Sequence, residues 1–268
     1  MKTAIVISSC DAFIDCWSPM ISSLNKFWAD CPLSIYFISN NKKIIDEKIK
    51  FINVGVDNGF ASNLKCSLKQ IDCDYVIYFQ EDYFLTDYVN TEAIMKHICH
   101  CYNNNIDFLK IHANDFLLRD NYRIANSDYC TNPIDVRYSI NTSIALWKKD
   151  TLEKLCVEGY SGWDWERKII SFIKSNSISI KSEILHSSCY KDKGIITLQG
   201  GAVAKGRWTQ NGKSFLLENG FEDVLEKREV EGKIITNLGK FYNLHPHSIL
   251  KFPIAFLLRI LIKYNLNF

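Results

Sequence analysis

The sequence lacks the cysteine spacing that is typical of zinc sites and redox motifs. Its ten cysteines include no Cys-x-x-Cys motif, and most of them lie inside apolar stretches. That pattern is typical of reduced, buried thiols and argues against a small disulfide scaffold. A secretory signal is also missing, because the apolar run near the N-terminus, residues 4–7, is too short. We therefore expect a cytoplasmic protein.

The chain has neither a charge imbalance nor internal repeats nor a low-complexity linker. Its 32 basic and 30 acidic residues give a formal net charge of +2. This near balance gives no large excess of positive charge with which to bind nucleic acid, so we expect no nucleic-acid partner. With 268 residues and 47% hydrophobic content, the chain is long enough to bury a sizeable core as one large domain.

No apolar run is long enough to span a bilayer. The most apolar segment, residues 249–263, is interrupted by Lys251, Pro253 and Arg259 and is shorter than the roughly 20 residues that a spanning helix needs. On a helix, Arg259 and Lys263 share one face and aliphatic side chains cover most of the rest. Two interpretations remain open. The segment lies in the membrane interface at the inner face of the cytoplasmic membrane, or it packs on the core or on a second subunit.

The first half of the sequence alternates strand and helix patterns, which predicts a mixed α/β fold of the Rossmann-like type. Its mostly parallel sheet would be flanked by helices and joined by right-handed crossovers. The expected strands are residues 4–7, 33–38, 50–54 and 75–79, and the expected helices are residues 13–28 and 64–71.

The second half is less regular. We expect helices over residues 91–102, 151–156 and up to about 174, strands over 108–111 and 178–184, and an extended stretch over 138–147. The glycine-rich, basic segment 199–208 predicts a mobile or ligand-shaped loop. A boundary near residue 110 would separate a sheet-rich first half from the second half.

The acidic pair Glu81-Asp82 directly follows the apolar strand 75–79. Charge at the end of a buried strand costs desolvation energy unless the carboxylates stay wet, find a partner or hold a cation. In open α/β sheets, ligands bind beyond the carboxyl ends of the strands. A nucleotide-sugar donor carries two phosphates that a divalent cation can neutralise, and Asp82 is the candidate ligand for that cation.

A second acidic motif, Trp163-Asp164-Trp165-Glu166, interleaves two carboxylates with two indoles. A carboxylate beside aromatic rings can act as the base that deprotonates a sugar hydroxyl. The indoles of Trp163 and Trp165 would offer a stacking surface for the acceptor sugar. On a helix the two acids point to different faces, so we expect one base, Glu166, with Asp164 as the alternative.

Taken together, five segments that follow the first strand resemble bacterial glycosyltransferases of the GT-A fold that build capsule or lipopolysaccharide sugars. The segments are Ser9-Cys-Asp11, Phe27-Trp-Ala-Asp-Cys-Pro32, Gly59-Phe-Ala-Ser-Asn-Leu64, the stretch 75–85 and Ser161-Gly-Trp-Asp-Trp-Glu166. The likeness extends over about residues 4–210. It implies one catalytic domain over residues 1–240, with a nucleotide-sugar half to about residue 110 and an acceptor half from 111, followed by a C-terminal amphipathic helical tail over 241–268.

The resemblance also implies roles for individual residues. Asp82 would bind the metal and the diphosphate with Glu81 beside it, and Glu166 would be the acceptor-side base. Ser9, Asp11 and the Ser62-Asn63 turn would lie against the nucleotide. The implied partners are a nucleotide-sugar donor and a glycan or lipid-linked glycan acceptor.

One position departs from that family. Gln80 stands where an Asp-x-Asp motif would have its first carboxylate, and glutamine can hydrogen-bond a ribose but binds a divalent ion weakly. The expected Mn²⁺ or Mg²⁺ would then rely on Asp82. His186 would complete the coordination shell, because a histidine follows the base motif in some relatives, and a histidine without a ligand role is the alternative. Lys205 and Arg207 are the candidates to neutralise the leaving diphosphate, and a solvated basic loop is the alternative.

The segment His97-Ile-Cys99-His100-Cys101 has metal-ligand residue types. A zinc site needs four ligands, and no partner cluster is evident, so we do not expect zinc. The sequence favours transfer of a sugar, with inversion, to a hydroxyl of a bacterial surface glycan such as capsule, O-antigen or lipooligosaccharide. The alternatives are a non-catalytic nucleotide- or carbohydrate-binding module of the same fold and a nucleotidyltransferase. The latter would be expected to show a glycine-rich phosphate loop after the first strand, which Ser8–Asp11 is not.

Overall fold

A computed structural model describes residues 2–111, 128–134, 139–185 and 195–232. His186 and the apolar segment 249–263 lie outside the described residues. The chain divides into two compact units: residues 1–81 with 85–197 form the first, and residues 82–84 with 198–268 form the second. Each unit is described in turn.

The first unit is built on an eight-stranded sheet in the order β3-β2-β1-β4-β7-β5-β8-β6. The strands are β1 (Thr3–Ser8), β2 (Ser34–Ser39), β3 (Ile49–Asn53), β4 (Tyr75–Gln80), β5 (Phe108–Lys110), β6 (Tyr129–Thr131), β7 (Ala145–Lys148) and β8 (Ser182–Leu185). Neighbours among the first four strands are parallel, β7 is antiparallel to both β4 and β5, and β8 is parallel to β5. The expected mixed, mostly parallel α/β sheet is therefore confirmed.

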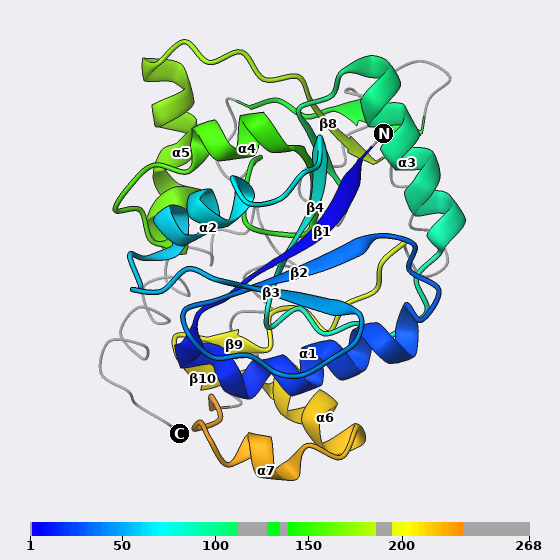
Figure 1. The fold of residues 1–268 in the computed structure, drawn as a ribbon, viewed down its shortest axis with the longest axis vertical. Helices are drawn as coiled ribbons and strands as arrows, with labels where there is room; N and C mark the ends of the chain where they lie inside the picture. Colours follow the sequence, from blue (N-terminus) through cyan, green and yellow to red (C-terminus); the bar gives the residue numbers. More distant parts are fainter. Residues whose placement is uncertain (1, 112–127, 135–138, 186–194, 233–268) are drawn as a thin grey trace, which may run out of the picture. The chain divides into compact units, whose positions relative to one another are not determined.

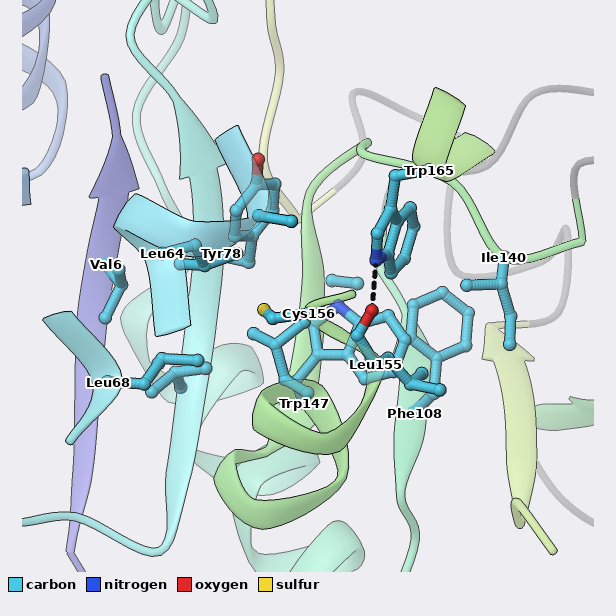
Figure 2. Close-up of a cluster of buried hydrophobic side chains, with 14 of the residues drawn as sticks. Val6, Leu64, Leu68, Tyr78, Phe108, Ile140, Trp147, Leu155, Cys156 and Trp165 are labelled. Carbon is cyan, nitrogen blue, oxygen red and sulfur yellow. Dashed lines mark hydrogen bonds between the residues drawn. The ribbon is translucent and has the colours of Figure 1, made fainter. Parts of the chain in front are cut away.

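One face of this sheet is covered by α2 (Phe60–Leu68), α4 (Lys149–Leu155) and α5 (Gly162–Ser175). The strands are apolar on this face, and their side chains form a buried cluster with the three helices (Figure 1). Figure 2 shows its centre, where Trp147 of β7 lies among Phe108 of β5, Leu155 of α4 and Trp165 of α5. This packing fixes the start of α5 against the sheet.

The opposite face is covered by α1 (Ile14–Phe27) and α3 (Thr91–Asn104). Trp17 of α1 packs edge-on against Phe37 of β2. The Tyr75 hydroxyl of β4 donates hydrogen bonds to two backbone carbonyls, those of Cys101 at 3.1 Å and Ile106 at 2.9 Å, at the end of α3. Helices on both faces explain why β1 and β4 are apolar along almost their whole length.

The second unit contains the hairpin of β9 (Val203–Ala204) and β10 (Arg207–Trp208), followed by α6 (Gln210–Glu218) and α7 (Glu222–Leu225). Lys205 and Gly206 form the two-residue turn, and both have positive φ, 51° and 79°, as the turns that match strand twist require. The ring of Phe84 packs on Phe215 of α6 at 4.8 Å. This hairpin takes up residues 203–208 of the segment 199–208, which we expected to be a mobile or ligand-shaped loop.

Two other expectations need correction. Residues 60–63 were expected to precede the helix, yet α2 begins at Phe60, after Gly59 with φ of +83°. The sheet also continues through residue 110, because β5, β6, β7 and β8 extend it beyond β4. The expected boundary near residue 110 therefore does not end the sheet, and the division into a nucleotide-sugar half and an acceptor half stays a prediction. Among the helices of the described residues, none is long and apolar enough to cross a membrane.

Gly212 on α6 gives a test of the packing in the second unit. A Cβ atom at this position would overlap the backbone carbonyl of Ala202, and backbone atoms do not tolerate such a close approach. Gly212→Ala should therefore lower the free energy of unfolding by about 1–3 kcal/mol, as overpacked sites do, although alanine favours helix more than glycine. Urea unfolding measures this loss. Ser214→Ala, on the exposed face of the same helix, is the control and should be neutral. Equal stability of G212A and wild type would contradict the close approach.

Candidate active site

The first unit has a topological switch point between β1 and β4. From β1 the chain proceeds to β2 and β3 on one side, and β4 then pairs with β1 on the other side, with Ser8 opposite Gln80 at the last position. Connections that depart in opposite directions leave a crevice beyond the carboxyl ends of two such strands, and ligands of open α/β sheets bind there. Gln80 lies at this end of β4, half-buried, with Glu81 directly after it.

The segment after β1 is held by hydrogen bonds to its neighbours. Ser9 Oγ accepts a hydrogen bond of 2.8 Å from the indole Nε1–H of Trp17. The Asp11 carboxylate accepts backbone N–H groups of residues 40–42, the shortest at 2.9 Å from Asn40. Asp11 therefore fixes the chain that leaves β2. The predicted contact of Asp11 with the nucleotide stays a prediction.

The start of α2 lies at the same edge of the sheet, because α2 follows β3. Asn63 donates to the Asp57 carboxylate at 2.8 Å and accepts the backbone N–H of Asn58 at 3.1 Å. These bonds shape the loop in front of the helix. The Ser62 hydroxyl is buried and has no hydrogen-bond partner. Ser62 and Asn63 thus lie in the first turn of a helix and not in the separate turn that we expected.

Carboxylates gather around the end of β1. Burial raises the pKa of the Cys10 thiol, and the charges of Glu81, Asp57 and Asp11 raise it further. These three acids therefore lie close enough to influence one sulfur atom. A bare diphosphate would be repelled by such a field. Among the described residues, no group of three or more His, Cys, Asp and Glu side chains is arranged to hold a metal ion. A cation here would need oxygens of the substrate to complete its shell.

The loop before β7 brings the second acidic motif to this edge. Ala145 pairs with Tyr78 in an antiparallel register, so the residues before Ala145 lie beyond the carboxyl end of β4. From there Thr142 donates to Glu166 Oε1 through both its backbone N–H at 2.9 Å and its hydroxyl at 2.6 Å. The start of α5 also meets the start of α2, where the Ala61 N–H donates to the Tyr160 carbonyl. Glu166 therefore belongs to the carboxyl edge of the sheet.

Asp164 has a different environment from Glu166. Ser161 caps α5 by accepting the Asp164 N–H, and its hydroxyl donates to the Asp164 carboxylate at 2.7 Å. Arg167 and Lys168, one turn further on, form ion pairs with that carboxylate at 3.2 Å and 3.0 Å. The Ser161 hydrogen bond, with help from Lys168, lowers the pKa of Asp164 to about 2. A carboxylate that holds protons so weakly is a poor general base.

The two tryptophans of the motif differ in solvent exposure. Trp163 is 63% exposed and presents its ring to solvent. Trp165 is 2% exposed, and its Nε1–H donates to the Leu155 carbonyl at 2.8 Å (Figure 2). The prediction that Trp165 stacks on an acceptor sugar is therefore wrong, because its ring is part of the core. Trp163 alone keeps that role as a prediction.

Sequence reasoning missed Lys110. Its side chain is 1% exposed at the end of β5, and burial lowers its pKa to about 8 while the charge of Glu166 opposes that change. The sequence does contain a signal, a lysine inside the apolar run Phe108-Leu-Lys-Ile111. Only the structure shows that this lysine is buried. Thr142 was also missed, since nothing in its sequence context marks it.

In the second unit, Asp82 is 7% exposed and its carboxylate accepts the Val203 N–H at 3.0 Å. Burial raises its pKa to about 6, although this hydrogen bond and the charge of Arg228 oppose the shift. Lys205 is exposed at the hairpin turn, and Arg207 pairs with Glu229 at 3.0 Å. Metal binding by Asp82 and diphosphate binding by Lys205 and Arg207 stay predictions.

A cavity of about 820 Å³ lies elsewhere in the first unit, and its lining residues include His100, Asn132 and Glu183. None of the predicted site residues lines it. His100 of α3 hydrogen-bonds Glu183 of β8 at 2.7 Å and stacks on Tyr129, while His97 bonds the Tyr129 hydroxyl. Both histidines of this segment thus have protein hydrogen-bond partners, and the expected absence of zinc stays a prediction.

Comparisons with known proteins give similarity of structure only. No protein-family model matches the sequence, and no curated protein sequence is significantly similar to it. TarS from S. aureus, residues 1–349 in complex with UDP-GlcNAc, shares 13% identity over 69% of this chain and 56% of that chain, with a TM-score of 0.46. CMP:2-keto-3-deoxy-manno-octonic acid synthetase complexed with CTP shares 9% identity over 82% and 99%, with a TM-score of 0.48.

A cytidylyltransferase from Leptospira borgpetersenii shares 14% identity over 68% of this chain and 74% of that chain, with a TM-score of 0.42. The described chain thus spans a little over half of the TarS structure in the complex. At these identities and TM-scores, the similarities do not determine what this chain binds or which reaction it performs.

The raised pKa of Asp82 predicts a pH dependence of stability. The folded protein binds this proton more tightly than the unfolded chain, whose aspartate has a pKa of 3.8. The contribution of Asp82 to stability is therefore present at low pH and is lost as the pH rises from about 4 to about 6. Asp82→Asn, which carries no charge, should be more stable relative to wild type at pH 7 than at pH 4, by up to roughly 3 kcal/mol.

Urea unfolding at several pH values between 4 and 7 measures this difference. Asp223→Asn, an exposed substitution in the same unit, controls for the general effect of removing a carboxylate. Parallel stability curves for D82N and wild type would mean that the Asp82 carboxylate is not desolvated.

Proposed function

We propose that this protein is a glycosyltransferase that moves a sugar from a nucleotide-sugar donor to a hydroxyl group of a glycan acceptor, with inversion at the anomeric carbon. The observation that supports this most is the Glu166 carboxylate, fixed by two hydrogen bonds from Thr142 at the carboxyl edge of the sheet. Both bonds end on Oε1, and no residue of the described ranges hydrogen-bonds Oε2. Oε2 is therefore the oxygen that would accept a proton.

The donor would bind at the switch point of β1 and β4. The half-buried Gln80 and the segment after β1, Ser9 to Asp11, line the position where nucleotides bind in sheets of this topology. Glu81 and Asp57 make that position electronegative, which favours a donor whose diphosphate is accompanied by Mn²⁺ or Mg²⁺. We keep Asp82 as the expected ligand of that cation.

The reaction would be a single displacement. The acceptor oxygen attacks the anomeric carbon, its proton passes to Glu166 Oε2, and the bond between the anomeric carbon and the phosphate oxygen breaks as the nucleoside diphosphate leaves. The exposed ring of Trp163, three residues before Glu166, would offer its face to the acceptor sugar. The resemblance in sequence suggests a bacterial surface glycan, whether capsule, O-antigen or lipooligosaccharide, as that acceptor.

Replacing the base gives the most direct test. Glu166→Gln keeps the oxygen that Thr142 holds but cannot take a proton, so kcat should fall ~10²-fold or more while donor binding is nearly unchanged. Release of nucleoside diphosphate measures turnover. Asp164→Asn is the matched comparison, because Asp164 is tied to Ser161 and Lys168, and its kcat should stay within about threefold of wild type. If D164N and not E166Q lost activity, the two acids would exchange roles.

A panel of nucleotide sugars tests the donor class. A true donor at a hundred times its dissociation constant should stabilise the folded protein by ~2.7 kcal/mol, and this shift should be larger with Mn²⁺ than with EDTA if a cation accompanies the diphosphate. Thermal unfolding measures both. Stabilisation by a donor without any release of nucleoside diphosphate would identify a binding module and not a transferase.

A further inference from the structure

The cavity of about 820 Å³ in the first unit lies at the edge of the sheet opposite to the candidate active site. Its lining includes residues 180–183, which lead into β8 and begin it. β8 is parallel to β5, and β5 and β4 are both antiparallel to β7, so β8 runs in the same direction as β4. The start of β8 is therefore at the amino edge, whereas Gln80 and Glu166 are at the carboxyl edge. The cavity is a second site and not an extension of the first.

Hydrogen-bonded polar side chains from α3 and β8 form part of the cavity wall (Figure 1). Asn104 Nδ2 lies 3.2 Å from His100 Nδ1, and His100 Nε2 lies 2.7 Å from Glu183 Oε2. An amide nitrogen only donates, so Nδ1 accepts and the ring proton is assigned to Nε2, which donates to Glu183. Within the described ranges, no residue hydrogen-bonds the other carboxylate oxygen, Oε1. That oxygen is available to a ligand.

A second acceptor in the wall lacks a donor. Asn132 is 2% exposed, and its Nδ2 donates to the Ser139 carbonyl at 3.1 Å and to Ser182 Oγ at 2.8 Å. Its Oδ1 is buried without a hydrogen-bond partner. A buried acceptor without a donor destabilises the fold. Glu183 and Asn132 therefore both favour a ligand that donates hydrogen bonds.

The charges of the wall balance each other. Lys181 donates from Nζ to the Asn104 carbonyl at 2.8 Å, and its ammonium has further N–H groups to donate. With Glu183, it gives the described lining one charge of each sign. A phosphate or a cation would meet one like charge there, so a neutral ligand is favoured. The lining also contains three apolar side chains, Pro133, Ile134 and Ile180.

We propose that this cavity binds a sugar unit of the glycan acceptor, away from the site of transfer. The choice of a sugar among neutral, hydroxyl-rich ligands rests on the proposed function, in which a glycan is the substrate. A sugar hydroxyl both donates and accepts, so neighbouring hydroxyls serve Glu183 Oε1 and the Lys181 ammonium, while the C–H face of the ring packs on Ile180. The volume lies within the range of small-ligand pockets, roughly 300–1,000 Å³.

Saturation-transfer NMR tests this binding without any assay of activity. Maltose, lactose and N,N′-diacetylchitobiose are titrated separately into the whole chain, and at least one should bind saturably. Thr131→Phe, an exposed substitution at the cavity, fills the space, and Lys181→Met removes the ammonium. Each should raise the Kd about tenfold or more. Lys174→Met, at an exposed position of α5, is the control and should leave the Kd unchanged. The absence of binding by all three probes would overturn the proposal.

Trp163→Ala shows at which edge of the sheet the sugar is bound. Trp163 is the residue proposed to stack on the acceptor sugar at the carboxyl edge, so W163A should leave the Kd of a probe in the cavity unchanged. A Kd that rises in W163A and not in T131F would mean that the probe binds at the acceptor position. That result would overturn the proposal.

The two ideas fail in different ways. If the wild-type protein releases no nucleoside diphosphate with any donor and acceptor, the proposed function fails, and sugar binding that T131F and K181M weaken still supports the cavity as a sugar site. If transfer is observed, T131F should raise the KM of an oligosaccharide acceptor and leave kcat within about twofold of wild type. Transfer with an unchanged KM in both variants would exclude the cavity as an acceptor site and leave the role of Glu166 intact.

Discussion

The pairing of β1 with β4 is the constraint on which the first unit depends. The two strands are parallel over six positions, from Thr3 with Tyr75 to Ser8 with Gln80, and both are buried on both faces. Because β2 pairs with the other side of β1 and β7 with the other side of β4, this register sets the level at which every strand of the sheet ends. The polar residues that follow β1 and β4 are brought to one edge as a result, and so is the loop that precedes β7.

A second level of organisation comes from α5. Its Trp165 enters the core beside Trp147, and this anchor determines the direction in which the next residue, Glu166, faces. The same helix start exposes Trp163 and ties Asp164 into its own cap. Four consecutive residues thus have four different environments, ranging from solvent to core. A motif of two acids and two indoles therefore contains one candidate base, one exposed ring, one capping acid and one core residue.

The sequence was sufficient to predict the sheet class and most strands, because buried strands such as Tyr75–Gln80 are continuous apolar runs bounded by polar turns. It also favoured Glu166 over Asp164 as the base, which stays a prediction. It could not show that Trp165 is buried, because Trp163 has the same residue type and nearly the same neighbours. Asp11 looked like a ligand for nucleotide, yet its partners are backbone N–H groups almost thirty residues away. The burial of Lys110 depends on the elements that pack over β5, which no local pattern specifies.

The two-residue turn between β9 and β10 determines which side chains of this hairpin are buried. Lys205 and Gly206 close it in two residues with left-handed backbone, and Trp208, which follows Arg207, is buried while Arg207 keeps partial contact with solvent. Side chains alternate between faces along a strand. One inserted residue at this turn would therefore exchange the two, placing a guanidinium in the apolar interior and an indole outside. Homologous chains of different lengths should accommodate their insertions away from this tip.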